Sequence, residues 1–282
     1  MKKTLIFIVS LFIALIVSLY LFLDTKTNIN SISSPSKNTD NTNESKKDIT
    51  KSEKQQTDKS VINFLEHISS TKGKVKIVAL GDSVTFGIGA FTEKGSRFSN
   101  AWGGLLAKYL NNDVANIRNA TVINKGFPRR STSELLKEKR VDEVIRENPD
   151  LVIFEVCLFN NQSKAVSLAQ TNLDIDTIVS QIQTKLPNTL ILIQSPNPST
   201  SRTDKRTNRI GLTYQDYLTS TKEHIKNKEW HYIDTYKSYQ EILNKKHLQL
   251  EETLISDGIH PNNKGYMVWF EVLKEAFSKP LS

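Results

Sequence analysis

Residues 75–83 read VKIVALGDS, a nearly continuous apolar run that ends in a glycine, an acid and a serine. A run that is apolar at successive positions is typical of a strand buried on both faces of a parallel sheet. A serine on the turn that leaves such a strand can point its hydroxyl into the crevice at the sheet edge. This stretch therefore predicts a parallel sheet and a first candidate residue, Ser83.

Four later segments repeat this apolar pattern, and helical patterns separate them. We expect the further strands at 121–124, 151–159, 189–194 and 231–234. We expect the main helices at 101–111, 131–148, 173–186, 214–226 and 262–277. This alternation predicts an α/β fold, namely a doubly wound, mainly parallel five-stranded sheet with helices on both faces.

Three parts are expected along the 282 residues: 1–23, 24–60 and 61–282. Residues 4–23 carry no charge, and a helix of that length would span roughly 30 Å, which matches a bilayer core. Two lysines precede this run, so we expect a transmembrane anchor with the remaining chain outside the cell. A cleaved signal peptide, which would give a secreted protein, is the alternative. Residues 24–60 are polar and poor in large apolar side chains, which predicts a disordered linker.

The composition excludes several classes of protein. A single cysteine rules out an internal disulfide framework and a zinc site built from cysteines. The formal net charge of +8 is spread along the chain, and the excess within 61–282 is ordinary for a soluble domain. We therefore expect no nucleic-acid partner. No G-K-[ST] sequence occurs, which excludes a phosphate-binding loop of that type.

A second candidate site lies near the end of the chain, where residues 256–261 read SDGIHP. Asp257 stands three residues before His260 on a turn that contains glycine and proline. The carboxylate could accept from one ring nitrogen and leave the other free to take a proton from a serine. Each signal alone has a simpler reading, because Ser83 could merely cap a helix and 256–261 could be a solvated turn.

Together, the motifs at 81–83 and 257–260 resemble the SGNH/GDSL hydrolase family of serine esterases, lipases and acylhydrolases, and the resemblance covers about 75–282. It implies a flavodoxin-like sheet in which strands one and three are neighbours and strand two lies on the other side of strand one. It implies Ser83 as the nucleophile, with Asp257 and His260 as the other members of a triad. It also implies that no cofactor or metal is needed.

The resemblance further implies an oxyanion hole, formed by the Ser83 N–H, Gly126 and an asparagine. The family usually shows G-x-N-D after the third strand, whereas residues 157–161 read CLFNN. The glycine is missing, and Asn161 stands where an aspartate is usual. We assign the oxyanion role to Asn160, with Asn161 as the alternative.

The expected reaction is cleavage of an acyl ester, with a short-chain or O-acetyl group favoured. Outside a membrane the substrate would be an acylated envelope polysaccharide or a lipid. Two other functions stay open: an O-acyltransferase with the same triad, and a non-catalytic envelope-binding module. Basic residues after strands two and four could favour an anionic polymer, or could simply be solvated: Arg129, Arg130, Arg202, Lys205, Arg206 and Arg209.

Overall fold

The structure, a computed structural model, describes residues 60–202 and 205–281. Its centre is a five-stranded parallel sheet in the order β2-β1-β3-β4-β5. The strands are β1 (Val75–Gly81), β2 (Ala120–Gly126), β3 (Leu151–Glu155), β4 (Leu190–Gln194) and β5 (Tyr232–Ile233). This order confirms the expectation that β1 and β3 are neighbours with β2 on the other side of β1.

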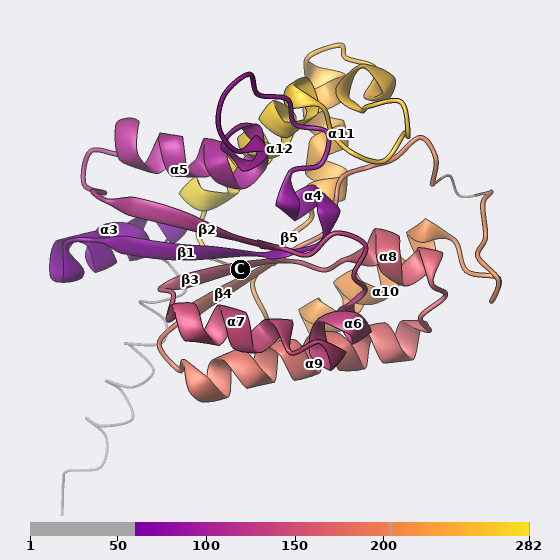
Figure 1. Cartoon of the computed structure of the whole chain (residues 1–282), viewed down its shortest axis with the longest axis horizontal. Helices are drawn as coiled ribbons and strands as arrows, with labels where there is room; N and C mark the ends of the chain where they lie inside the picture. Colours follow the sequence, from indigo (N-terminus) through magenta and orange to yellow (C-terminus); the bar gives the residue numbers. More distant parts are fainter. Residues whose placement is uncertain (1–59, 203–204, 282) are drawn as a thin grey trace, which may run out of the picture. The chain divides into compact units, whose positions relative to one another are not determined.

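Helices cover both faces of this sheet (Figure 1). One face carries α3 (Val61–Lys72), α5 (Trp102–Asn112), α11 (Thr235–Lys245) and α12 (Asn263–Ser278). The other face carries α6 (Thr132–Lys137), α7 (Arg140–Glu147), α9 (Leu168–Lys185) and α10 (Tyr214–Asn227). Four short elements complete the chain: α4 (Ser83–Phe86), α8 (Leu158–Ser163) and the 3-10 helices η1 (Arg97–Asn100) and η2 (Leu250–Thr253).

The core explains why the strands are apolar at successive positions. All five residues of β3 are buried, as are six of the seven residues of β1, because helices pack on both sides of them. On the α5–α12 side, Trp102 and Trp269 stack with their ring centroids 6.0 Å apart. Both ends of the described domain also meet, since Ser60 forms an antiparallel bridge with Pro280.

Several predicted boundaries were wrong: α9, expected at 173–186, begins at Leu168, and β2, expected at 121–124, covers Ala120–Gly126. Two further differences have a clear cause in the backbone. The third strand ends at Glu155 rather than at residue 159, because Cys157 adopts a left-handed backbone (φ 52°) and α8 begins directly after it. The helix expected over 131–148 is two helices, since Lys139 adopts φ 56° between α6 and α7. The capping box of Ser131 and Glu134 is present at the start of α6.

The anchor expected at 4–23 and the linker expected at 24–60 lie outside the described residues, apart from Ser60. Within the part of the chain that the structure describes, no helix is long and apolar enough to cross a bilayer.

Candidate active site

The turn after β1 positions Ser83 at the carboxyl end of the sheet. Asp82 caps the following helix α4 by accepting from the Val84 N–H at 3.0 Å. A side chain at position 81 would be impossible without rearrangement, because an added Cβ would lie 2.2 Å from Thr85 Oγ1 and 2.6 Å from Glu155 Oε2. The glycine thus lets the chain turn tightly and leaves Ser83 as the first residue of α4, with 8% of its surface exposed.

A second turn, between η2 and α12, positions His260. Asp257 Oδ1 accepts hydrogen bonds from the backbone N–H groups of Ile259 (2.8 Å) and His260 (3.0 Å). Its other oxygen, Oδ2, lies 2.6 Å from His260 Nδ1. Gly258 adopts φ 68°, and an added Cβ there would lie 2.5 Å from Thr200 Oγ1. A single carboxylate therefore shapes the turn and orients the imidazole.

The two turns meet, because His260 Nε2 lies 2.8 Å from Ser83 Oγ although the residues are 177 positions apart. Partial burial raises the pKa of Asp257, but hydrogen bonds from the His260 ring and from two backbone N–H groups outweigh it and hold the pKa below its usual value. An ionised Asp257 requires the His260 proton on Nδ1. Nε2 is then a free acceptor for the Ser83 hydroxyl.

Helix α12 holds this arrangement together. Tyr266 is fully buried on α12, and its hydroxyl donates to the Ile88 carbonyl at 2.7 Å while lying 3.0 Å from the Val84 carbonyl. Both carbonyls belong to α4 or to the loop directly after it. The helix that follows His260 is therefore bonded to the segment that follows Ser83.

Gly126 ends β2 directly beside Gly81. An added Cβ would lie 2.2 Å from Phe86 N and 2.8 Å from the Asp82 carbonyl oxygen, so the close approach of β2 to α4 requires glycine. The Gly126 N–H donates to Asn124 Oδ1 at 2.8 Å. For Gly126 to serve as an oxyanion donor, Asn124 would have to release it.

The two asparagines of α8 have different surroundings. Asn160 Nδ2 donates to Asp82 Oδ2 at 2.6 Å, which places its amide beside the nucleophile turn. Asn161 is buried away from that turn, where its Oδ1 accepts from the Thr132 N–H (2.9 Å) and its Nδ2 donates to Thr171 (3.1 Å). Of the two candidates for the oxyanion hole, only Asn160 contacts the turn that carries Ser83.

Beneath Ser83 lie two buried carboxylates whose pairing the sequence did not reveal. Burial raises the pKa of Asp82, although hydrogen bonds from Val84 and Asn160 partly oppose the shift. The pKa of Glu155 is raised well above its usual range. Burial is the largest cause, and repulsion from Asp82 is the second. Glu155 accepts from the Asp82 N–H at 3.0 Å and from the Cys157 N–H at 2.8 Å. It therefore supports the turns after β1 and β3 at once.

Together with Cys157, these two carboxylates form the one candidate metal cluster among the described residues. Ligand atoms of Asp82, Glu155 and Cys157 lie within 4.8 Å of one another. Their oxygen atoms already accept hydrogen bonds from protein donors, and burial keeps the pKa of Cys157 well above its usual value, which opposes formation of a thiolate ligand. We assign this cluster a supporting role.

Residues 79–268 match the model of a family described as the GDSL-like Lipase/Acylhydrolase family. Among solved structures, the chain is similar to a catalytic mutant of Axe2, an acetylxylan esterase from Geobacillus stearothermophilus, at 18% identity over 73% of this chain and 94% of that one, with a TM-score of 0.55. A lipase/acylhydrolase from Enterococcus faecalis is 22% identical over 74% of this chain and 99% of that one, with a TM-score of 0.54. These likenesses show a shared fold. No curated protein matches the chain in sequence.

Proposed function

Because this chain belongs to the GDSL-like lipase/acylhydrolase family, it is an acylhydrolase, and we propose that it cleaves short acyl esters with Ser83 as the nucleophile. The observation that carries the proposal is the continuous hydrogen-bond chain from Ser83 Oγ through His260 to Asp257, with distances of 2.8 Å and 2.6 Å. These are the contacts that a serine, a base and an orienting acid need for acyl transfer.

In the first half of the reaction, Ser83 Oγ attacks the ester carbonyl carbon while its proton passes to His260 Nε2. The tetrahedral intermediate then collapses, and Nε2 returns the proton to the departing alcohol oxygen. Asp257 stays ionised and stabilises the imidazolium. In the second half a water attacks the acyl-serine carbonyl carbon while its proton passes to Nε2. The bond between Ser83 Oγ and the acyl carbon then breaks, Nε2 returns the proton to Oγ, and the free acid leaves.

Three donors are proposed for the developing oxyanion. The Ser83 N–H has no hydrogen-bond acceptor among the described residues and lies at the start of α4. Asn160 uses one amide proton for Asp82 and keeps the other for the substrate. The Gly126 N–H would join after release from Asn124. Losing one such donor typically costs about 3–4 kcal/mol of transition-state stabilisation.

An O-acetyl group on a carbohydrate is the favoured acyl ester. This preference is supported by the fold that the chain shares with Axe2, which is described as an acetylxylan esterase, so acetylated carbohydrates are the substrates to test first. We also propose that residues 4–23 anchor the enzyme in the membrane with its catalytic domain outside the cell, where such esters occur. Protease treatment of intact cells tests this orientation, because an internal domain would be protected.

The central test is hydrolysis of 4-nitrophenyl acetate by the full-length protein. Ser83→Ala should lower kcat by at least about 10³-fold while the circular dichroism spectrum stays unchanged. The matched control is Ser70→Ala, an exposed serine on α3. A fluorophosphonate probe should label wild type and the control but not Ser83→Ala. Equal turnover or labelling in wild type and Ser83→Ala would rule out the nucleophile assignment.

A further inference from the structure

Two loops carry cationic side chains and are bonded to the segment that carries Asn160: one to Ser163 at the end of α8, the other to Lys164 directly after it. Arg129 comes from the loop after β2. Arg202 and Arg206 come from the loop after β4. Their contacts set them apart from the other arginines nearby.

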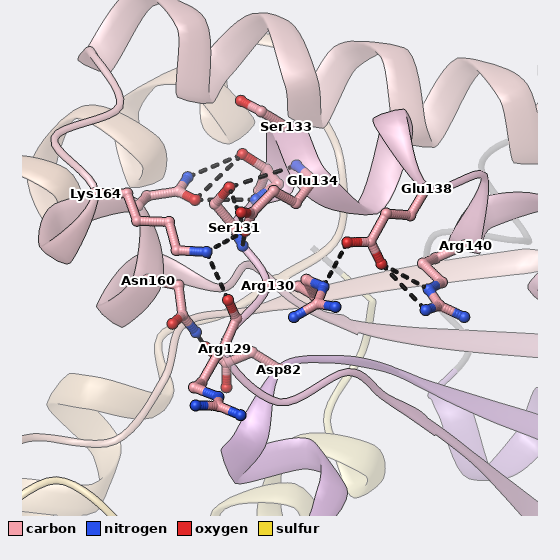
Figure 2. Close-up of polar contacts among 12 residues, drawn as sticks. Asp82, Arg129, Arg130, Ser131, Ser133, Glu134, Glu138, Arg140, Asn160 and Lys164 are labelled. Carbon is pink, nitrogen blue, oxygen red and sulfur yellow. Dashed lines mark hydrogen bonds and ion pairs between the residues drawn. The ribbon is translucent and has the colours of Figure 1, made fainter.

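The position of Arg129 is fixed through its backbone. Lys164, which follows α8, donates to the Arg129 carbonyl at 2.7 Å and also pairs with Glu134. Arg129 adopts φ 63°, a left-handed conformation that is unfavourable for a side chain with a Cβ. In Figure 2 its guanidinium points away from the paired groups of α6, toward the part of the view in which Asp82 meets Asn160.

Arg202 is fixed between α8 and the His260 turn. The residues just before it are bonded to this turn, since the N–H groups of Thr200 (3.0 Å) and Ser201 (3.3 Å) both donate to the Gly258 carbonyl. Arg202 Nη2 then donates to Ser163 Oγ, at the end of α8, at 2.9 Å. Its guanidinium therefore lies at the end of α8, and the backbone just before Arg202 is bonded to the turn that orients the imidazole.

The electrostatic environment of Arg202 is unfavourable in the free enzyme. Arg206 Nη1 donates to the Ser201 carbonyl at 3.1 Å, which brings a second guanidinium to the same place. Two causes lower the pKa of Arg202: burial is the larger, and repulsion from Arg206 is the smaller. The Nε–H of Arg202 is buried without a hydrogen-bond partner in the described residues. An anion next to this guanidinium would offset the repulsion between the two arginines.

Two arginines near Arg129 are compensated, as Figure 2 shows for one side of the site. Arg130 pairs with Glu138 at 2.6 Å, and Arg140 pairs with Glu138 and with Glu143. By contrast, within 60–202 and 205–281 no carboxylate forms an ion pair with Arg129, Arg202 or Arg206. Near the proposed active site, the guanidinium groups of Arg129, Arg202 and Arg206 thus have no carboxylate partner among the described residues.

We infer that the ester substrate carries a negatively charged group, a phosphate or a carboxylate, close to its acyl ester, and that Arg129 and Arg202 bind this group. The inference rests on the proposed esterase function and specifies its substrate class: an acylated anionic glycan or polyol phosphate. Guanidinium groups bind both anions well, because a phosphate and a carboxylate can each accept two parallel hydrogen bonds from the N–H groups of one arginine. Bound there, the anion would hold the acyl group over Ser83.

The test compares matched acetate esters that differ by one charge. Glycerol monoacetate is paired with acetylated glycerol phosphate, and an O-acetylated hexose with the corresponding uronic acid. Acetate release by the full-length protein gives kcat/KM for each. We expect wild type to prefer one anionic member by at least about tenfold, mostly through KM. The pair that shows the larger preference identifies phosphate or carboxylate. This preference should fall as salt rises, because salt screens exposed charges.

Variants assign the preference to the two arginines. Arg129→Gln and Arg202→Gln should each lower the anionic-to-neutral ratio of kcat/KM by about tenfold, and Arg202→Lys should restore part of it because the charge is kept. The matched control is Arg118→Gln, an exposed arginine that precedes β2 at the opposite end of that strand, and it should leave the ratio unchanged.

Two outcomes would overturn the inference, and they can be told apart. Cleavage of neutral and anionic esters with equal kcat/KM, or a preference that survives both glutamine substitutions, rejects the anionic substrate but leaves the esterase intact. Failure of wild type to cleave any of the four esters, together with no labelling by the fluorophosphonate probe, rejects the proposed function and this inference with it.

Discussion

The Asn160 side-chain amide donates to the buried carboxylate of Asp82 at 2.6 Å, and this bond joins the turn that carries Ser83 to helix α8. Asp82 also accepts from the Val84 N–H with its other oxygen. One carboxylate thus positions both the start of α4 and the amide proposed to face the oxyanion. It acts through its neighbours, so we describe Asp82 as a positioning residue.

Asp82→Asn should therefore lower kcat for 4-nitrophenyl acetate by at least about tenfold with little change in KM. An amide that keeps its oxygen on the Val84 N–H turns its own NH₂ toward Asn160, so that two donors face each other. Asp113→Asn, at the exposed end of α5, is the control and should be silent. An unchanged kcat in Asp82→Asn would show that Asn160 needs no such partner.

A second His–Asp pair provides a control for the proposed base. His224 Nε2 lies 2.6 Å from Asp176 on α9, a contact as short as that between His260 and Asp257, but no serine among residues 60–202 and 205–281 bonds to the His224 ring. His260→Ala should lower kcat by at least about 10³-fold, since triad members act as a unit. His224→Ala should retain full turnover. Comparable losses in the two variants would contradict the assignment of His260.

The raised pKa of Glu155 predicts that stability depends on pH. A folded state that holds a proton more tightly than the unfolded chain becomes less stable as pH rises above the ordinary carboxyl pKa, until the raised pKa is passed. The free energy of unfolding should thus fall from pH 5 upward, with a limiting slope of about 1.4 kcal/mol per pH unit for each such proton.

Glu155→Gln should flatten this dependence, because the amide cannot ionise. Urea unfolding at pH 5, 6, 7 and 8 measures it, with the exposed Glu251→Gln as the control. Identical pH slopes in wild type and Glu155→Gln would mean that Glu155 is ionised in the folded protein throughout this range.

Gly126→Ala should destabilise the domain and reduce its activity together. The added methyl would lie 2.2 Å from Phe86 N, so α4 must shift, at a cost of about 1–3 kcal/mol that also displaces Ser83. Gly211→Ala is the comparison, because there nothing lies within 4 Å and only the left-handed backbone (φ 78°) is strained. It should cost about 1–2 kcal/mol and leave kcat unchanged. Unfolding curves and kcat measured together separate the two effects.

The strands could be predicted because burial on both faces leaves a direct record in the sequence. The start of β3 and the end of β4 were predicted to the residue, and β1 differed only by the addition of Gly81. Boundaries set by single backbone angles could not be predicted. Nothing in the residue types of Lys139 or Cys157 indicates a left-handed conformation, which glycine would normally signal.

The candidate site divides in the same way. Ser83, Asp257 and His260 were found because each lies in a short local motif, and the parallel sheet topology brings the motifs to one edge. The choice between Asn160 and Asn161 needed coordinates, because adjacent residues on a helix point in different directions. The Asp82–Glu155 pair was not found, since it joins residues from two strands without a local pattern.

The bonds from Tyr266 to the α4 segment mean that neither the N-terminal nor the C-terminal part of the domain can form the proposed active site alone. One reacting group follows β1 and the other precedes α12, so the ribosome must release the chain beyond residue 260 before the two can meet. A nascent or C-terminally clipped chain would hold the nucleophile but no base. Catalytic turnover would then be a measure of complete folding. Loss of the contact between α12 and α4 would abolish this turnover.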